Sequence, residues 1–338
     1  MDNLSQALLG AAAARALYSR SLERSATWIG AVSGALADVD VLIVRAVDHP
    51  FPEILHRHFT HCLAFIPVGA LIAALPFLAS PRFRERWRAV LGASLAAYAT
   101  HGLMDACTSY GTHLLWPFSD ARTAWDCLPI IDPIPTLSLL VGVVLSHRRG
   151  RRRPAVLALL AFVLYCGLGV IQHERVAGAQ AEIAASRGHR IERARSLPMP
   201  LSLLLWRSVY VAEGRVWVDH VTAPPAGPMR FRPEGSAEHV TAAGLARGDA
   251  ELERELDYLE LFSDGFMARV PRDPAVIGDE RISPTGDLRP LRGVRIEPYR
   301  GHRIRYLPSP FESGIDPKRF LRWIRDREGY RPLPKTSD

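Results

Sequence analysis

A run of 22 residues, positions 59–80, contains no aspartate, glutamate, lysine or arginine. As an α-helix this run would be about 33 Å long, which is enough to cross a hydrocarbon core of roughly 30 Å. The mean hydropathy of the whole chain is close to zero, as in many globular proteins, but it averages an apolar first half and a charged second half. We therefore expect the first half to lie in a membrane.

Four further segments are apolar but only about 16 to 18 residues long, and they are residues 28–44, 89–104, 130–146 and 154–171. Each is a marginal span by itself. Residues 4–18 are weaker still, because Arg15 interrupts them. The sequence predicts a mainly α fold: a polytopic transmembrane bundle of five to six helices in residues 1–172, followed by a small soluble α+β domain in residues 173–338. No basic region of a cleavable export signal precedes the first apolar segment, so we expect the helices themselves to direct insertion.

Arginine is unevenly distributed among the connections between the apolar segments. The connections 19–27, 81–88 and 147–153 together hold eleven arginines, whereas the alternate connections 45–58 and 105–129 hold three. Short arginine-rich loops stay in the cytoplasm. We therefore expect the opposite ends of the helices, and with them the C-terminal domain, on the periplasmic side of the inner membrane. The net charge of +7 fits loops at a lipid surface, and we expect no nucleic-acid partner.

Acidic and imidazole side chains gather at the predicted outer ends of these segments. His101 and Asp105 are four residues apart, so on a helix they share one face and could hold one cation. Asp38 and Asp40 cannot share a helical face, but they can converge if the helix ends there. A bound cation would offset two acids at a helix C-terminus, which otherwise oppose the helix dipole.

Three histidines lie within six residues in the stretch HRHFTH. Their spacing puts His58 and His61 on one helical face. Three imidazoles beside an apolar span are hard to explain by packing, and they favour metal or phosphate binding. The predicted metal ligands are Asp38, Asp40, His56, His61, His101 and Asp105.

Mixed histidine and aspartate ligands suit zinc, with manganese or iron as alternatives, and such an ion can activate water for hydrolysis. His58 or Asp132 could pass protons, although Asp132 before Pro133 equally fits a helix cap. Two other interpretations stay open. The same residues could bind a structural metal or hold the bundle together without catalysis, or they could serve an ion-coupled transporter, which would require acids at mid-span.

Other catalytic templates are absent from the sequence, including a G-x-S-x-G elbow, a P-loop, H-E-x-x-H and a dinucleotide fingerprint. The four cysteines form no C-x-x-C pair, which argues against a zinc ribbon or a redox motif. Cys107 and Cys127 could pair in an oxidising compartment, or they could be small buried apolar side chains.

An ordered set of motifs carries a resemblance to a known family: MDNLSQALLGAA, GALADVDVL, HRHFTHCL, THGLMDACTSYGTHLLWPFSD and IIDPIPTL. Residues 1–175 resemble the YdjM-like family of LexA-regulated inner-membrane proteins, presumed to be metal-dependent hydrolases. The resemblance implies a helical membrane domain whose metal site uses the six ligands named above. The family is also distantly similar to zinc-dependent phospholipase C and P1 nuclease, which implies a phosphoester or lipid-linked substrate. This chain departs from the family pattern at Ala37 and Asp38, at His58 and at Asp126.

The second half has the pattern of a soluble domain. Residues 207–221 alternate apolar and polar positions about Glu213 and Gly214, which predicts a β-hairpin. Further strands are expected at residues 266–270, 275–283 and 291–299, and helices at 173–186, 237–262 and 316–327. We expect His220, Asp219 and Asp264 at a solvated surface.

Overall fold

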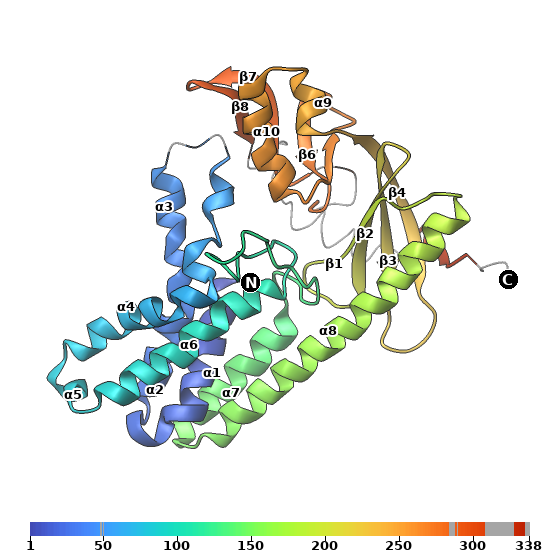
Figure 1. The fold of residues 1–338 in the computed structure, drawn as a ribbon. Helices are drawn as coiled ribbons and strands as arrows, with labels where there is room; N and C mark the ends of the chain where they lie inside the picture. The colour runs from blue at the N-terminus through green and yellow to red at the C-terminus, as the bar shows by residue number, and fades with distance from the viewer. Residues whose placement is uncertain (48, 50, 284–287, 289, 308–327, 335–338) are drawn as a thin grey trace. The chain divides into compact units, whose positions relative to one another are not determined.

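The computed structural model describes residues 1–47, 49, 51–283, 288, 290–307 and 328–334. The described chain forms two compact units. The helical unit comprises residues 1–47, 55–171 and 200–202, and the sheet unit comprises residues 48–54, 172–199 and 203–338. Helix α8 (Arg153–Ser186) begins in the helical unit and ends in the sheet unit (Figure 1).

Helix α1 (Asn3–Leu22) is the centre of the helical unit and packs against α2 (Ser25–Ala35), α6 (Trp87–Ala106) and α7 (Pro133–Arg149). Its N-cap is Asp2, whose carboxylate accepts a hydrogen bond from the backbone N–H of Ser5 at 3.0 Å. Small residues let α1 and α2 approach closely: a Cβ on Gly34 would lie 2.7 Å from the carbonyl oxygen of Gln6. The shorter elements are η1 (Leu36–Asp40), α3 (Val41–Ala46), η3 (Phe59–His61), η4 (Leu63–Phe65), α4 (Ile66–Leu78) and α5 (Pro81–Arg84).

The predicted bundle of five to six membrane spans is wrong. In the part of the chain that the structure describes, two helical segments are long and apolar enough to cross a membrane, Ser25–Val44 and Arg153–Ser186. The uncharged run 59–80 does not form one helix, because η3 and η4 occupy its beginning and α4 has only 13 residues. At 1.5 Å per residue α4 is about 20 Å long, which is too short for a hydrocarbon core.

The second half is also different from the small α+β domain that the sequence predicts. Its described residues form a nine-stranded antiparallel sheet in which β1 to β8 are neighbours in chain order and β9 pairs with β4. The first strands are β1 (Arg193–Pro198), β2 (Leu205–Ala212), β3 (Arg215–Thr222) and β4 (Arg230–His239). The others are β5 (Met267–Arg269), β6 (Val276–Asp279), β7 (Gly293–Tyr299), β8 (His302–Leu307) and β9 (Arg331–Pro332).

The predicted hairpin is confirmed, since β2 and β3 pair in register from Ala212 opposite Arg215 to Leu205 opposite Thr222. Both turn residues, Glu213 and Gly214, have positive φ, as a tight hairpin turn requires. The predicted helix 237–262 is only partly correct, because it is divided into the end of β4, α9 (Ala242–Ala246) and α10 (Ala250–Phe262). The predicted helix 316–327 lies outside the described residues.

Charged side chains are buried within the sheet unit, contrary to the expected surface role of Asp219 and His220. Asp219 accepts two hydrogen bonds from the Arg187 guanidinium, at 2.8 and 2.5 Å. Glu234 lies 2.6 Å from Nη1 of Arg207 and 2.5 Å from Nε2 of His220. Strand β2 is buried along its whole length, so polar groups beside it need partners inside the protein.

This buried network makes the stability of the sheet unit depend on pH. Burial alone raises the pKa of Glu234, but Arg207 and His220 outweigh burial and lower it from 4.5 to about 2. A carboxylate with a lowered folded-state pKa stabilises the fold above its unfolded pKa. We expect this contribution, on the order of 3 kcal/mol, to be lost as the pH falls from about 4.5 towards 2.

Thermal melts of the full-length protein across that pH range, followed by circular dichroism, measure the effect. Glu234→Gln should flatten the dependence of the melting temperature on pH. Glu238→Gln is the matched control, because the Glu238 side chain is 59% exposed and pairs with Arg269 at the surface. Equal slopes for the wild type and Glu234→Gln would contradict the assignment.

Candidate metal centre

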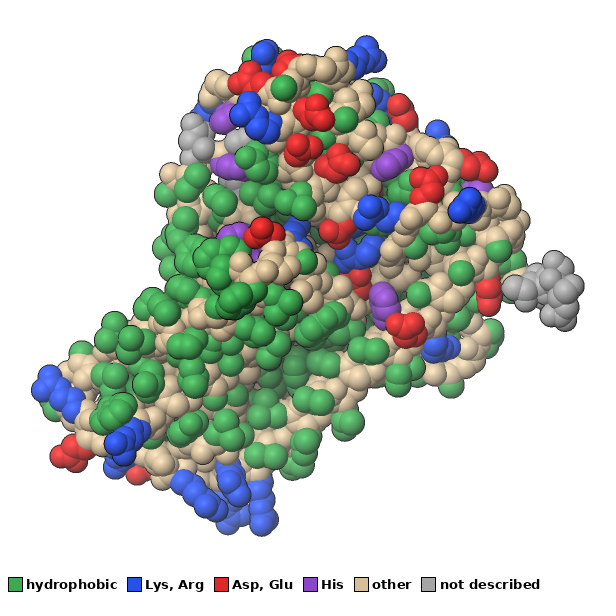
Figure 2. Space-filling view, in the orientation of Figure 1, with side chains coloured by type: hydrophobic (Ala, Val, Ile, Leu, Met, Phe, Trp, Pro, Cys, Tyr) green, Lys and Arg blue, Asp and Glu red, His purple; other side chains and the backbone are tan. Residues whose placement is uncertain are grey.

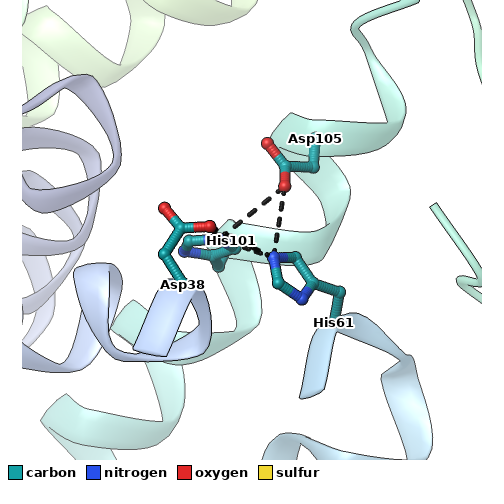
Figure 3. Close-up of side chains that lie close together, drawn as sticks. All are labelled: Asp38, His61, His101 and Asp105. Carbon is teal, nitrogen blue, oxygen red and sulfur yellow. Dashed lines mark hydrogen bonds and ion pairs between the residues drawn. The ribbon is translucent and has the colours of Figure 1, made fainter. Parts of the chain in front are cut away.

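Three elements of the helical unit bring four side chains together. Asp38 lies on the 3-10 turn η1, His61 ends the 3-10 turn η3, and both His101 and Asp105 lie on α6. Their ligand atoms all lie within 4.8 Å of one another, and the side chains point towards a common centre (Figure 3). His61, His101 and Asp105 are buried, while the side chain of Asp38 is 10% exposed.

The distances within this cluster fit a tetrahedral zinc site. Zinc ligands at about 2.0 to 2.1 Å from the metal lie about 3.3 to 3.4 Å from one another in a tetrahedron. Oδ1 of Asp38 lies 3.4 Å from Nε2 of His61 and 3.3 Å from Nε2 of His101. Oδ2 of Asp105 lies 3.4 Å from Nε2 of His61 and 3.7 Å from Nε2 of His101. The two Nε2 atoms are 3.1 Å apart.

Hydrogen bonds fix the orientation of both imidazoles. Nδ1 of His101 donates to the carbonyl oxygen of Gly34 at 2.6 Å. Nδ1 of His61 lies 2.9 Å from Oγ1 of Thr60, which itself donates to Oδ2 of Asp40 at 3.0 Å. The hydroxyl of Thr60 therefore accepts from His61, and each neutral ring carries its proton on Nδ1.

With both rings in this neutral form, the unprotonated Nε2 atoms of His61 and His101 face each other at 3.1 Å. Two lone pairs at that distance repel unless a cation or a shared proton lies between them. The Oδ2 atom of Asp38 is also buried and accepts no hydrogen bond from any residue that the structure describes. Both observations fit a site whose remaining partner is a metal ion.

Local sequence explains how η3 can lie against α6. Gly102 follows His101, and a Cβ at this position would lie 2.1 Å from the carbonyl oxygen of His61. Glycine is therefore required for the backbone of η3 to approach α6 closely enough for His61 and His101 to meet. Gly34 on α2 contributes through its backbone carbonyl, which accepts the hydrogen bond from Nδ1 of His101.

Asp40 and His56, also predicted as metal ligands, lie at the edge of the cluster. Together with Asp38 they form a second group whose ligand atoms lie within 4.8 Å of one another. Oδ1 of Asp40 lies 2.9 Å from Nδ1 of His56, and its Oδ2 accepts from the backbone N–H of Arg57 at 3.1 Å. With Thr60 as a further donor, the Asp40 carboxylate supports the loop that carries the histidines.

The predicted proton carriers, Asp132 and His58, contact groups other than the four clustered side chains. Asp132 is the N-cap of α7, where Oδ1 accepts from the backbone N–H of Ile134 at 2.9 Å and Oδ2 accepts from the Tyr165 hydroxyl at 2.5 Å. The ring of His58 packs 4.7 Å from that of His113 and 5.5 Å from that of Trp116. Burial lowers the pKa of His58, so its imidazole is neutral at pH 7.

Arg57 is a further member of the site that the sequence did not single out. Its Nε atom lies 3.1 Å from Oδ2 of Asp105, its Nη1 donates to Thr108 at 2.9 Å, and its guanidinium lies over the Tyr110 ring at 4.6 Å. Its backbone has a positive φ of 63°, which is strained for an arginine and is held by the bond to Asp40. The only feature of the sequence that could have indicated a role for Arg57 in the site is its position between His56 and His58.

Positive groups keep Asp105 ionised. Burial by itself raises the pKa of Asp105, but Arg57, the N-terminal amine, His101 and His61 outweigh burial and hold the pKa well below its usual range. Gln6 also donates to Oδ1 of Asp105 at 2.9 Å, and the N-terminal amine of Met1 contacts the same oxygen. Asp105 is therefore a carboxylate at pH 7, which is the form that binds a cation.

The cysteines lie beside this region as free thiols. Cys62 and Cys127 are buried, while Cys107 and Cys166 are partly buried. Cys107 is the C-cap of α6, two residues after Asp105, and its carbonyl accepts from the backbone N–H of Cys127 at 3.0 Å. Cys107, Cys127 and Cys166 pack in and around an apolar core of the helical unit.

Comparison with protein families gives one finding. The family model described as YdjM inner membrane protein matches residues 1–176, which is more than half of the 338-residue chain. The match includes all four clustered side chains and confirms the resemblance seen in the sequence motifs. The description gives a membrane location and no reaction. No curated protein and no solved structure matches the chain.

The geometry assigns Asp38 as a metal ligand and Asp40 as a carboxylate that supports the ligands. Substitution of each should therefore lower metal affinity to a different extent. Asp38→Asn is expected to abolish tight metal binding, because it removes a charged atom from the cluster. Asp40→Asn should weaken affinity about 10- to 100-fold, the usual cost of losing a group that orients a ligand. Competition of the purified protein with a chromogenic chelator measures both. The control is Asp120→Asn, since Asp120 is exposed. Equal effects of the Asp38 and Asp40 variants would contradict this division.

Proposed function

This chain belongs to the YdjM inner membrane protein family, and on that premise we propose that it is a membrane-bound, metal-dependent hydrolase. Its substrate is a phosphoester or a lipid-linked phosphoester, and hydrolysis takes place at the periplasmic face of the inner membrane. The observation that carries the proposal is the convergence of Asp38, His61, His101 and Asp105 on one centre with tetrahedral spacing.

Zinc is the ion that this set suits best. Two imidazole nitrogens and two carboxylate oxygens are borderline ligands, which zinc accepts in a four-coordinate site, with manganese and iron as alternatives. The hydrogen bonds from Nδ1 of His61 and His101 leave both Nε2 atoms available to an ion. A divalent cation bound there supplies Lewis acidity and lowers the pKa of an adjacent water molecule.

The residues around the cluster have distinct parts in this proposal. Asp38 is the most accessible member, so a substrate phosphate approaches from its side, where His56 is also half-buried. Arg57 balances the charge of Asp105 and holds it in place. Asp40 orients the His61 ring through Thr60. Proton transfer in this proposal falls to His58 or Asp132.

We infer the orientation in the membrane from the arginines between the two described candidate spans, Ser25–Val44 and Arg153–Ser186. The stretches 81–88 and 147–153 hold nine arginines, which favours a cytoplasmic location for them. The cluster lies at the other end of α6, which begins at Trp87 and carries the site at His101 and Asp105. We infer that the cluster and residues 173–338 are on the periplasmic side.

A structural metal is the alternative, and the burial of the site favours it. His101 and Asp105 are 0% exposed, and the carboxylate of Asp105 already contacts Arg57, Gln6 and the N-terminal amine. An ion enclosed in this way would tie η1 and η3 to α6 without meeting a substrate. A hydrolase and a structural site would both bind metal, so only a measurement of substrate hydrolysis distinguishes them.

The test is turnover by the zinc-loaded, full-length protein on bis-p-nitrophenyl phosphate and on phospholipid vesicles. We expect hydrolysis that a chelator abolishes and that zinc restores. His61→Ala combined with His101→Ala should reduce the rate by at least about 10³-fold, because both nitrogen ligands are lost.

A matched control replaces histidines outside the cluster: His147, which lies 3.0 Å from Thr27, and His239, which lies 3.0 Å from the Gly265 carbonyl. His147→Ala and His239→Ala should keep the activity. Stoichiometric metal without turnover on either substrate class would instead favour the structural alternative. Turnover that persists in the double histidine variant would exclude the proposed site.

A further inference from the structure

The end of the helical unit remote from the metal cluster carries a pocket lined by arginine. Helix α1 runs from the cluster, where Gln6 contacts Asp105, to Arg20 in its last turn. Its 20 residues span about 30 Å at 1.5 Å per residue. The pocket has a volume of about 560 Å³ and is lined by Ser19, Arg20 and residues 150–153.

The turn that forms this pocket has a defined structure. Helix α7 ends at Arg149, its C-cap Gly150 has a φ of 65°, and Arg151, Arg152 and Arg153 follow directly. Oγ of Ser146 donates to the carbonyl of Arg151 at 2.8 Å, and Nε of Arg15 donates to the same hydroxyl at 2.9 Å.

Arg15 is fully buried, and it also donates to the carbonyl of Glu23 at 2.5 Å. A buried cation thus connects α1 to the α7–α8 turn. The three arginines of the turn are exposed, and they are presented on a framework held by these bonds.

Two apolar grooves meet at the same arginines. One, of about 680 Å³, lies between α7 and α8 and is lined by side chains that include Leu137, Val141 and Leu157. The other, of about 690 Å³, lies between α1 and α8 and includes Leu17, Leu157 and Val163. Arg153 lines the pocket and both grooves. Figure 2 shows the apolar surface of the helical unit bordered at this end by Lys and Arg side chains.

We propose that this region binds one anionic phospholipid, with its phosphate in the arginine pocket and its two acyl chains in the two grooves. The lining of the pocket contains four arginines and no acidic residue, so it is complementary to a phosphate, which arginine can bind through two parallel hydrogen bonds. The two apolar grooves can hold acyl chains, which neither a soluble phosphate nor a nucleic acid possesses.

The membrane character of α8 supports the same occupant. Arg153–Ser186 is one of the two described segments that are apolar enough to span a membrane. It begins at Arg153 of the pocket, and Arg151 and Arg152 directly precede it. Leu157 lines both grooves and is 65% exposed. Juxtamembrane arginines attract the anionic lipids of the cytoplasmic leaflet. The site is at the opposite end of α1 from the metal cluster, so it is separate from the proposed hydrolase site.

The test is a native mass spectrometry titration of the full-length, detergent-solubilised protein with palmitoyl-oleoyl phosphatidylglycerol and, separately, palmitoyl-oleoyl phosphatidylcholine. The wild type should retain phosphatidylglycerol preferentially. Each basic residue near a membrane surface changes lipid affinity about fivefold, so R151Q/R152Q/R153Q should bind phosphatidylglycerol roughly 100-fold more weakly.

The matched control is R82Q/R84Q/R88Q, which removes three exposed arginines from another connection expected on the same side of the membrane. It should bind phosphatidylglycerol like the wild type. Leu157→Asn keeps the charges and makes the grooves polar, so it should weaken phosphatidylglycerol binding without changing the binding of glycerol phosphate. Equal losses in the two arginine variants, or glycerol phosphate binding as tightly as the phospholipid, would overturn the proposal.

Discussion

The two imidazole nitrogens that face each other at 3.1 Å are the feature on which the rest of the helical unit depends. Each ring is held by a hydrogen bond at Nδ1, so neither can turn away without leaving a buried polar group unsatisfied. Carboxylates close the other sides of the same centre. With both rings neutral, this arrangement is unfavourable unless a cation or a shared proton lies between the two nitrogen atoms. The cluster links η1, η3 and α6 at one point.

The helices are arranged so that this centre can form. Gly34 allows α2 to lie against α1 and provides the carbonyl that orients His101, while Gly102 allows η3 to lie against α6. The same bundle carries buried Arg15 at its other end, where it supports an arginine-rich turn. The helical unit thus presents two chemically different ends, one suited to a cation and the other to an anion.

The sequence predicted the parts of the site that depend on local spacing. His101 and Asp105 share a face of α6 as their separation of four residues implies, and the family motifs located the other members. It could not predict Arg57, which reaches Asp105 only because of tertiary packing. The predicted bundle of five to six spans is wrong, and its longest apolar run, residues 59–80, failed because hydropathy does not reveal that 3-10 turns break the run. Asp219 and His220 were expected in solvent, yet both are buried beside a strand that is covered along its whole length.

Zinc-edge X-ray absorption spectroscopy on the zinc-loaded, full-length protein tests the central claim most directly. The account predicts one ion with two imidazole nitrogens and two carboxylate oxygens at about 2.0 to 2.2 Å. The two imidazole signals should disappear in the variant that lacks both His61 and His101. A spectrum with sulfur ligands, or one unchanged in that variant, would contradict it.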